Sequence, residues 1–320
     1  MAFERILGHE RCVSVLRRSI DSGKTAHAYL FEGIEGCGRR TTALAFIQTL
    51  FCASNTGCGD CPSCRKMISG NHPDLHLLEP DGTFIKIDQI RALQKELSLR
   101  PYEASRKACI IKDAEQLNIS AANAMLKTLE EPPGNAVIVL LTTDASAVLS
   151  TIRSRCQLLR FAPLSNDTVR DCLVERGVAP DTAVTAAAVA RGSIGKALEI
   201  CGQETLSDRQ DRIAEFSAVS LSDIAGLFTL SERISAEKND TAAILDTFVS
   251  YLRDVQTLLY GGSDIANRDL LPLIEREAAR LTPDRVMKRI ASVMAARQAL
   301  QYNANTRLAL DLLFIRLAQC

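Results

Sequence analysis

Four cysteines lie close together in one short segment, and their spacing suits the binding of a metal ion. Of eleven cysteines in the chain, four lie within thirteen residues, at Cys52, Cys58, Cys61 and Cys64. Four thiolates suit tetrahedral Zn²⁺ with bonds of about 2.3 Å, and they leave no open coordination position for catalysis. A bacterial ferredoxin run would need another cysteine where Ile68 stands. The spacing therefore favours a structural zinc site over an iron–sulfur cluster, and four unliganded thiols remain the alternative.

A glycine-rich turn has the spacing of a phosphate-binding loop, with glycines at Gly33, Gly36 and Gly38. In a working loop, backbone N–H groups cradle phosphate, and a Lys followed by Ser or Thr contacts the phosphates and Mg²⁺. Here Arg39 and Arg40 occupy those two positions, and Thr41 comes one residue late. Because a guanidinium cannot coordinate Mg²⁺, we expect the shape of a nucleotide loop without bound ATP or Mg²⁺. A purely structural turn is the simplest interpretation.

A second segment resembles the acidic strand end of a nucleotide site. The apolar run 108–111 leads to Asp113, an acid placed to orient Mg²⁺. A hydrolysing enzyme of this type has Glu directly after the Asp, but this chain has Ala114 there and Glu115 one residue late. Both Mg²⁺ capture and water activation are compromised, so we expect no ATP hydrolysis by this chain alone.

The composition is that of a soluble globular protein. The chain has 320 residues, 47% apolar residues, and 38 basic against 38 acidic residues, which gives zero formal net charge. These values argue against disorder, a strongly basic nucleic-acid coat and an acidic tail. The charged N-terminal residues predict no signal peptide, and no apolar run of about 18 residues predicts a membrane span. We expect a cytoplasmic protein.

The elements that must position these residues alternate between strand and helix in the first half of the chain. Strands are predicted at 28–31, 75–78, 108–111, 137–141 and 157–161, with helices between them. This alternation predicts an α/β domain with a parallel sheet and helices on both faces. After Pro163 the pattern is helical throughout. We predict three domains: an α/β domain at 1–163, a small helical domain at 164–205 and a larger helical domain at 206–320.

Residues 123–133 (NAMLKTLEEPP) and the triplet Ser154-Arg155-Cys156 are the most specific part of the sequence. Together with Gly8-His9 they closely resemble the clamp-loader branch of the AAA+ ATPases. The cysteine cluster narrows this resemblance to the bacterial subunits of DNA polymerase III, and the degenerate loop narrows it to the delta-prime type. The resemblance implies an AAA+ module, a helical lid and a C-terminal helical collar that mediates oligomerisation.

The resemblance also implies roles for particular residues. It makes Arg155 an arginine finger that acts in trans on a neighbouring subunit's ATP, and it makes the four cysteines zinc ligands. The sensor-1 position falls at Thr142 or Thr143, and the sensor-2 region falls at 192–198. In the ATP-binding subunits an arginine stands where this chain has Gly195, which is a third loss from the nucleotide site.

The implied assembly is the DNA polymerase III holoenzyme, a DNA-directed DNA polymerase and hence a nucleotidyltransferase. The implied partners are the gamma/tau and delta subunits, with the sliding clamp and primer–template DNA within the complex and no membrane. The resemblance implies no activity for the chain alone. Two alternatives stay open: an ATP-binding motor subunit of the gamma/tau type, and a zinc-knuckle protein that binds DNA by itself. Arg155 can also be an ordinary surface residue.

Overall fold

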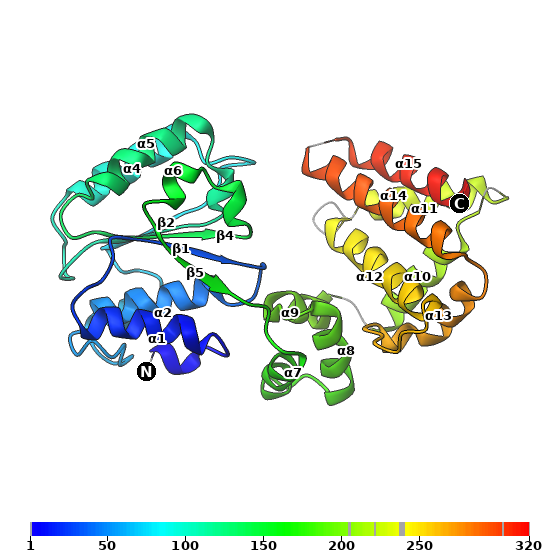
Figure 1. The fold of residues 1–320 in the computed structure, drawn as a ribbon, viewed down its shortest axis with the longest axis horizontal. Helices are drawn as coiled ribbons and strands as arrows, with labels where there is room; N and C mark the ends of the chain where they lie inside the picture. Colours follow the sequence, from blue (N-terminus) through cyan, green and yellow to red (C-terminus); the bar gives the residue numbers. More distant parts are fainter. Residues whose placement is uncertain (1, 204–205, 221, 237–240, 303, 320) are drawn as a thin grey trace. The chain divides into compact units, whose positions relative to one another are not determined.

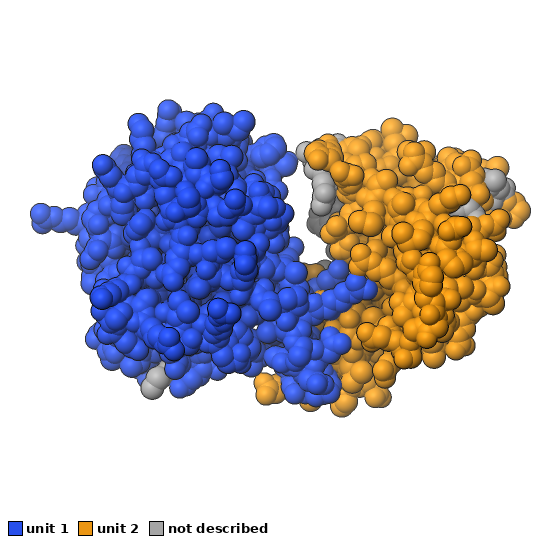
Figure 2. Space-filling model, in the orientation of Figure 1, with its two compact units in different colours: residues 1–172, 191–196 blue, residues 173–190, 197–320 orange. Residues whose placement is uncertain are grey.

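A computed structural model describes the whole chain except residues 1, 204–205, 221, 237–240, 303 and 320. The chain divides into two compact units, residues 1–172 with 191–196, and residues 173–190 with 197–320 (Figure 2). The predicted three-domain division stays a prediction, and its boundary at 205 adjoins residues outside the described part. None of the described helices is both long and apolar enough to cross a membrane.

The first unit is built on the predicted parallel sheet. Its strands are β1 (Ala28–Gly33), β2 (Leu75–Leu78), β3 (Ala108–Ile111), β4 (Val137–Thr142) and β5 (Gln157–Phe161). Their order in the sheet is β2-β3-β4-β1-β5, and each neighbouring pair is parallel. Parallel neighbours need crossover connections, which the helices provide, and β1 lies between β4 and β5 instead of beside β2.

Helices cover both faces of this sheet, as predicted. Helices α1 (Glu10–Asp21) and α2 (Arg39–Phe51) lie on one face, and α4 (Ile87–Ser98), α5 (Ile119–Glu130) and α6 (Ser150–Arg153) lie on the other (Figure 1). The strand residues alternate between the two cores: Val137 and Val139 face α1 and α2, whereas Ile138 and Leu140 face α4 and α5. Because helices cover both faces, the central strand β4 is apolar from Val137 to Leu141, and only its last residue, Thr142, is polar.

Two helix starts differ from the sequence prediction. Ser120 is of a residue type that would cap a helix over 121–130, but α5 begins at Ile119, and the Asn118 side chain accepts a hydrogen bond from the Ala121 N–H at 2.8 Å. Asp88 is also of a residue type that caps helices, but α4 begins at Ile87, and the Lys86 N–H donates to the Gln89 side-chain oxygen at 2.9 Å. Both differences arise because several neighbouring polar residues can cap a helix, and sequence alone does not select among them.

The rest of the chain is helical, as predicted. A short α3 (Pro62–Ile68) lies in the cysteine segment, and α7 (Asn166–Glu175), α8 (Pro180–Ala190) and α9 (Ile194–Gln203) follow the sheet. The C-terminal helices run in chain order as α10 (Leu206–Ala218), α11 (Ile224–Ala236), α12 (Thr241–Leu259), α13 (Leu271–Ala278), α14 (Pro283–Gln301) and α15 (Thr306–Gln319). They enclose their own apolar core, in which Phe216 stacks on Phe248 with ring centroids 4.0 Å apart.

Candidate functional site

The four clustered cysteines converge on one point between α2 and α3. Their sulfur atoms all lie within 4.8 Å of one another; Cys52 and Cys58 are separated by 3.7 Å and Cys58 and Cys64 by 4.0 Å. A regular tetrahedron with metal–sulfur bonds of about 2.3 Å has edges near 3.8 Å. The donor set and its spacing therefore fit one tetrahedral metal ion, and the sequence prediction that these four residues come together is confirmed.

The backbone around the cluster supports thiolate charge. The N–H groups of Cys58, Cys61 and Cys64 each point at the sulfur of the preceding cysteine in the set, at 3.4 to 3.5 Å. Burial raises the pKa of the Cys52 thiol, but hydrogen bonds from the Ser54 hydroxyl and the Cys58 N–H outweigh it and lower that pKa to about 5. Burial raises the pKa of the Cys64 thiol to about 12. A cation at the cluster would hold all four sulfurs as thiolates.

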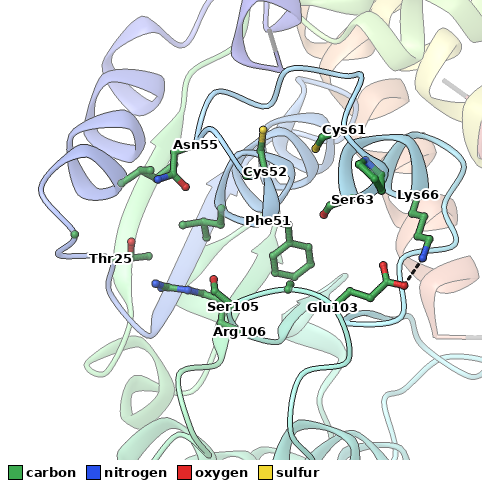
Figure 3. Close-up of a pocket in the computed structure, with 16 residues that line it drawn as sticks. Thr25, Phe51, Cys52, Asn55, Cys61, Ser63, Lys66, Glu103, Ser105 and Arg106 are labelled. Carbon is green, nitrogen blue, oxygen red and sulfur yellow. Dashed lines mark hydrogen bonds and ion pairs between the residues drawn. The ribbon is translucent and has the colours of Figure 1, made fainter.

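A pocket of about 790 Å³ opens beside the cluster. Figure 3 shows Phe51 among its lining residues, with Cys52 and Cys61 on one side and Ser105 and Arg106 on the other. An ion pair between Lys66 and Glu103 borders it. Since Cys61 is only half-buried, the pocket gives solvent and small solutes a path to one side of the cluster.

A buried carboxylate fastens the loop that forms this pocket wall. Asp74 is 0% exposed and accepts backbone N–H bonds from Tyr102, Glu103 and Ala104 at 2.6 to 2.8 Å. Burial raises its pKa, but these three hydrogen bonds outweigh burial and leave the pKa of Asp74 below its usual value. The neighbouring His72 ring contacts Phe51 and hydrogen-bonds the Ser63 hydroxyl at 2.9 Å. Hydrogen bonds and ring packing therefore hold the backbone around the cluster in place.

The glycine-rich loop has the predicted shape but does not offer the chemistry of a Mg²⁺–nucleotide site. Gly38 adopts φ +107° immediately before α2, where the loop meets the helix N-terminus. Arg39 is 8% exposed and its Nη1 has no hydrogen-bond partner among the described residues, whereas Arg40 turns to Glu79 at 3.0 Å. The Thr41 side chain is exposed, and the Thr42 hydroxyl donates to the Gly38 carbonyl. Neither of these two hydroxyls therefore stands at position 40, where a Mg²⁺ ligand is expected.

The loop is also tied from two sides by its own chain. The Gly195 N–H donates to the Gly36 carbonyl at 3.1 Å, and Nε2 of His9 hydrogen-bonds the Cys37 carbonyl at 2.7 Å. Gly195 and Ser193 belong to the segment 191–196, which packs with the first unit. This contact brings the predicted sensor-2 region against the loop, where it supplies a backbone group and no arginine.

The remaining nucleotide-type residues gather at the same edge of the sheet. Asp113 follows β3 with a left-handed φ of 52°, and burial raises the pKa of its carboxyl. The Glu115 carboxylate accepts hydrogen bonds from both the N–H and the hydroxyl of Thr143, at 3.1 and 2.7 Å. Thr142 is buried and its hydroxyl donates to the Asp144 carbonyl. Glu115 is thus held by Thr143 through Oε1, while its Oε2 is buried with no partner among the described residues.

Arg155 lies at the opposite edge of the sheet. Gln157, two residues later, pairs with Tyr29 at the start of β1, whereas Gly33 ends β1 opposite Phe161. The four intervening steps span about 13 Å of strand, so Arg155 lies well away from the glycine-rich loop of its own chain. Its guanidinium is 36% exposed and contacts Glu130 and the Thr151 carbonyl.

Comparison with known proteins places the chain in a family. The family model described as DNA polymerase III, delta subunit, matches residues 8–165, and its C-terminal counterpart matches residues 203–319. The DNA polymerase III subunit delta' of Bacillus subtilis is 33% identical over 317 residues, covering 97% of this chain and 96% of that protein. The chain belongs to the delta-prime family of DNA polymerase III subunits. The Escherichia coli subunit delta' is 28% identical and covers 88% of this chain and 85% of its own.

The delta-prime resemblance expected from the sequence is therefore confirmed. Among solved structures, a DNA polymerase III gamma subunit-related protein from Thermotoga maritima aligns with a TM-score of 0.47 and 21% identity, covering 95% of this chain and 98% of that one.

Two contacts of this delta-prime family member were not predicted from its sequence. Asp74 showed no signal beyond its place before a predicted strand, because its role depends on N–H groups some thirty residues later. Glu130 lies in the recognisable block, but only the folded chain brings it to Arg155, 25 residues away. Neither contact has a sequence spacing that predicts it.

Proposed function

We propose that this chain is a clamp-loader subunit of DNA polymerase III that does not hydrolyse ATP itself. In this role Arg155 serves as an arginine finger for the ATP of a neighbouring subunit. The single observation that carries the proposal is the place of Arg155, at the sheet edge opposite its own glycine-rich loop and partly open to solvent.

Arg155 is expected to act in trans because its side chain is too short to reach a nucleotide bound by its own chain. Phosphoryl transfer develops charge on the γ-phosphate, and a guanidinium supplied by a neighbour stabilises it, often by 10³ to 10⁵ in rate. The length of β1 separates Arg155 from the loop that would hold its own nucleotide, which is farther than an arginine side chain extends. An exposed guanidinium at that edge is available to a nucleotide bound by another chain.

The chain's own loop supports a non-hydrolysing role. Arg40 is paired with Glu79, Ala114 stands where a catalytic Glu is needed, and Glu115 is engaged by Thr143. The gamma/tau-type alternative requires both a Mg²⁺ ligand at position 40 and a carboxylate that activates water. The residues present therefore fit neither Mg²⁺ binding nor water activation.

We further propose that the cysteine cluster holds one structural Zn²⁺ ion. Four sulfur donors at near-tetrahedral spacing support zinc, and a closed set of four leaves no position for substrate. Bound zinc would tie the end of α2 to the start of α3, where Cys52 and Cys61 are the terminal residues.

The partners follow from the family. The proposed neighbours are gamma/tau and delta subunits in the cytoplasm, and the assembly would place a sliding clamp on primer–template DNA. The family model that matches residues 203–319 supports a collar role for α10–α15. Zero net charge is compatible with a subunit whose surface mainly meets proteins.

The decisive experiment replaces Arg155 in the reconstituted clamp loader. Arg155→Ala should leave the thermal unfolding of the chain unchanged and lower the DNA-stimulated ATPase rate of the complex at least tenfold. Arg155→Lys should also lower that rate, because a point charge does not replace a planar fork. Arg100→Ala, an exposed arginine elsewhere in the same unit, is the matched control.

An unchanged rate for Arg155→Ala would contradict the finger assignment. The motor alternative is tested separately by calorimetric titration of the isolated chain with ATP and Mg²⁺. Saturable binding coupled to phosphate release would favour the motor, and its absence would support the non-hydrolysing role. A salt-dependent affinity of the isolated chain for DNA would favour the stand-alone DNA-binding alternative.

A further inference from the structure

Arg155 is held by a carboxylate from a different helix. Its Nη2 donates to Oε1 of Glu130, the last residue of α5, at 2.5 Å. Its Nη1 donates to the Thr151 carbonyl in α6 at 3.0 Å. Two acceptors, one in α5 and one in α6, therefore hold the Nη1 and Nη2 atoms of the guanidinium.

The Nε atom of the guanidinium has no partner within the described part of the chain. The side chain has five N–H donors on three nitrogens, and within the described part of the chain Nε makes no hydrogen bond or ion pair. Nε and the remaining Nη2 hydrogen form the edge that binds an oxyanion in bidentate fashion. Glu130 contacts Nη2 alone and does not form a bidentate pair across Nε and Nη2.

The position of Glu130 is itself fixed by packing. Leu129 and Met125 of α5 are buried in the core against the sheet. The Gln94 side chain of α4 donates to the Ala124 carbonyl and the Thr128 hydroxyl of α5, at 2.9 and 2.8 Å. Pro132 and Pro133 follow within three residues and prevent continuation of the helix. The end of α5 is therefore a rigid support for a carboxylate.

We infer that Glu130 is a positioning residue for Arg155: it orients the guanidinium so that its open edge meets the γ-phosphate of the neighbouring subunit. This inference rests on the proposed finger role of Arg155. A flexible arginine loses side-chain entropy when it is placed for reaction, and an error of 1 Å in placement can cost 10²-fold in rate. An ion pair formed in advance removes part of that loss.

The opposite role, in which Glu130 holds the finger away from its target, predicts a different sign. Both side chains are partly exposed, Arg155 at 36% and Glu130 at 50%, and breaking an ion pair of that kind slows a step by about fivefold at most. If Glu130 restrained Arg155 in this way, replacing Glu130 would raise the ATPase rate by no more than that factor. Because Glu130 pairs with Nη2 alone, the pairing is compatible with binding of an oxyanion at the Nε side, so removing Glu130 should lower the rate.

The test is a double-mutant cycle in the reconstituted complex. Glu130→Ala should lower the kcat of the DNA-stimulated ATPase by up to about fivefold with KM for ATP unchanged, since the neighbour's binding site is intact. Glu130→Gln, whose amide oxygen still accepts from Nη2, should lower kcat less. In an Arg155→Ala background, Glu130→Ala should cause no further fall, because it acts only through that guanidinium.

Glu131→Ala is the matched control, since it removes the adjacent exposed carboxylate, which has no ion pair among the described residues. Its kcat should equal that of the unmodified complex, and all variants should melt at the same temperature. An unchanged or raised kcat for Glu130→Ala, or an undiminished fall in the Arg155→Ala background, would overturn the positioning role. If Arg155→Ala itself had no effect, the finger assignment would fail first, so the two failures are distinguishable.

Discussion

Gly195 donates its backbone N–H to the carbonyl oxygen of Gly36 at 3.1 Å. Gly36 has φ +73°, and a Cβ built there would lie 2.3 Å from the Ser193 hydroxyl and 3.0 Å from the Gly195 backbone. Two features therefore require glycine at position 36, a left-handed backbone and a close approach. The contact holds the segment 191–196 against the glycine-rich loop without any ligand.

Gly36→Ala should destabilise the protein by about 2–4 kcal/mol, which combines left-handed strain with overpacking. Gly82→Ala is the matched control, because Gly82 has nearly the same φ, +74°, and nothing within 4 Å of its added Cβ. The control should lose only the strain, about 1–2 kcal/mol. Chemical denaturation followed by circular dichroism measures both values. Equal losses of unfolding free energy in the two variants would show that Ser193 and Gly195 move aside without a free-energy cost.

Asp74→Asn should destabilise the first unit by about 1–3 kcal/mol at pH 7, because the neutral amide accepts the three backbone N–H bonds more weakly than a carboxylate does. The pKa of Asp74 is lower in the folded chain than in the unfolded chain. Its stabilising contribution is therefore fully present above the unfolded pKa, near 4, and is lost as the pH falls through the folded pKa.

The difference in unfolding free energy between Asp74→Asn and the unmodified chain should accordingly be constant from pH 6 to 8 and shrink below pH 4. Denaturation at a series of pH values measures it. Asp88→Asn, at an exposed position in the first turn of α4, is the control and should change stability little. A difference that stays constant down to the folded pKa would show that the Asp74 charge is not what the N–H groups stabilise.

One equivalent of zinc per chain is expected in the purified protein by atomic absorption. Cys58→Ser should remove it, because a hydroxyl is a poor replacement for a thiolate, whereas Cys201→Ser, a half-buried cysteine outside the cluster, should retain it. The ligands must be deprotonated, so zinc should be held at neutral pH and released as the pH falls. Zinc-free native protein, or zinc retained by Cys58→Ser, would argue against the site.

Local pattern determined a large part of this molecule. The five strands appear where β-branched and apolar runs lie between helical periods, and the four cysteines converge because turn residues separate them by so few positions. The departures from a nucleotide-binding sequence pattern are also local, since Arg39, Arg40 and Ala114 are read directly from the sequence. Leu308, Leu312 and Ile315 have the spacing of one helix face, but only Ile315 packs against the core, and Leu308 and Leu312 are 67% and 49% exposed. The core takes Leu310 and Leu313 instead, because α15 is apolar on more than one side and packing chooses the face.

Tertiary structure alone decided the rest. The strand order β2-β3-β4-β1-β5 and its register set Arg155 at the edge opposite the glycine-rich loop. The same folding brought Glu130 to Arg155 and the N–H groups of residues 102–104 to Asp74. These contacts join residues 25 to 30 positions apart, where no helical or strand period applies. The sequence therefore determined which chemical groups the chain carries, and only the crossover connections of a parallel sheet decided which of them meet.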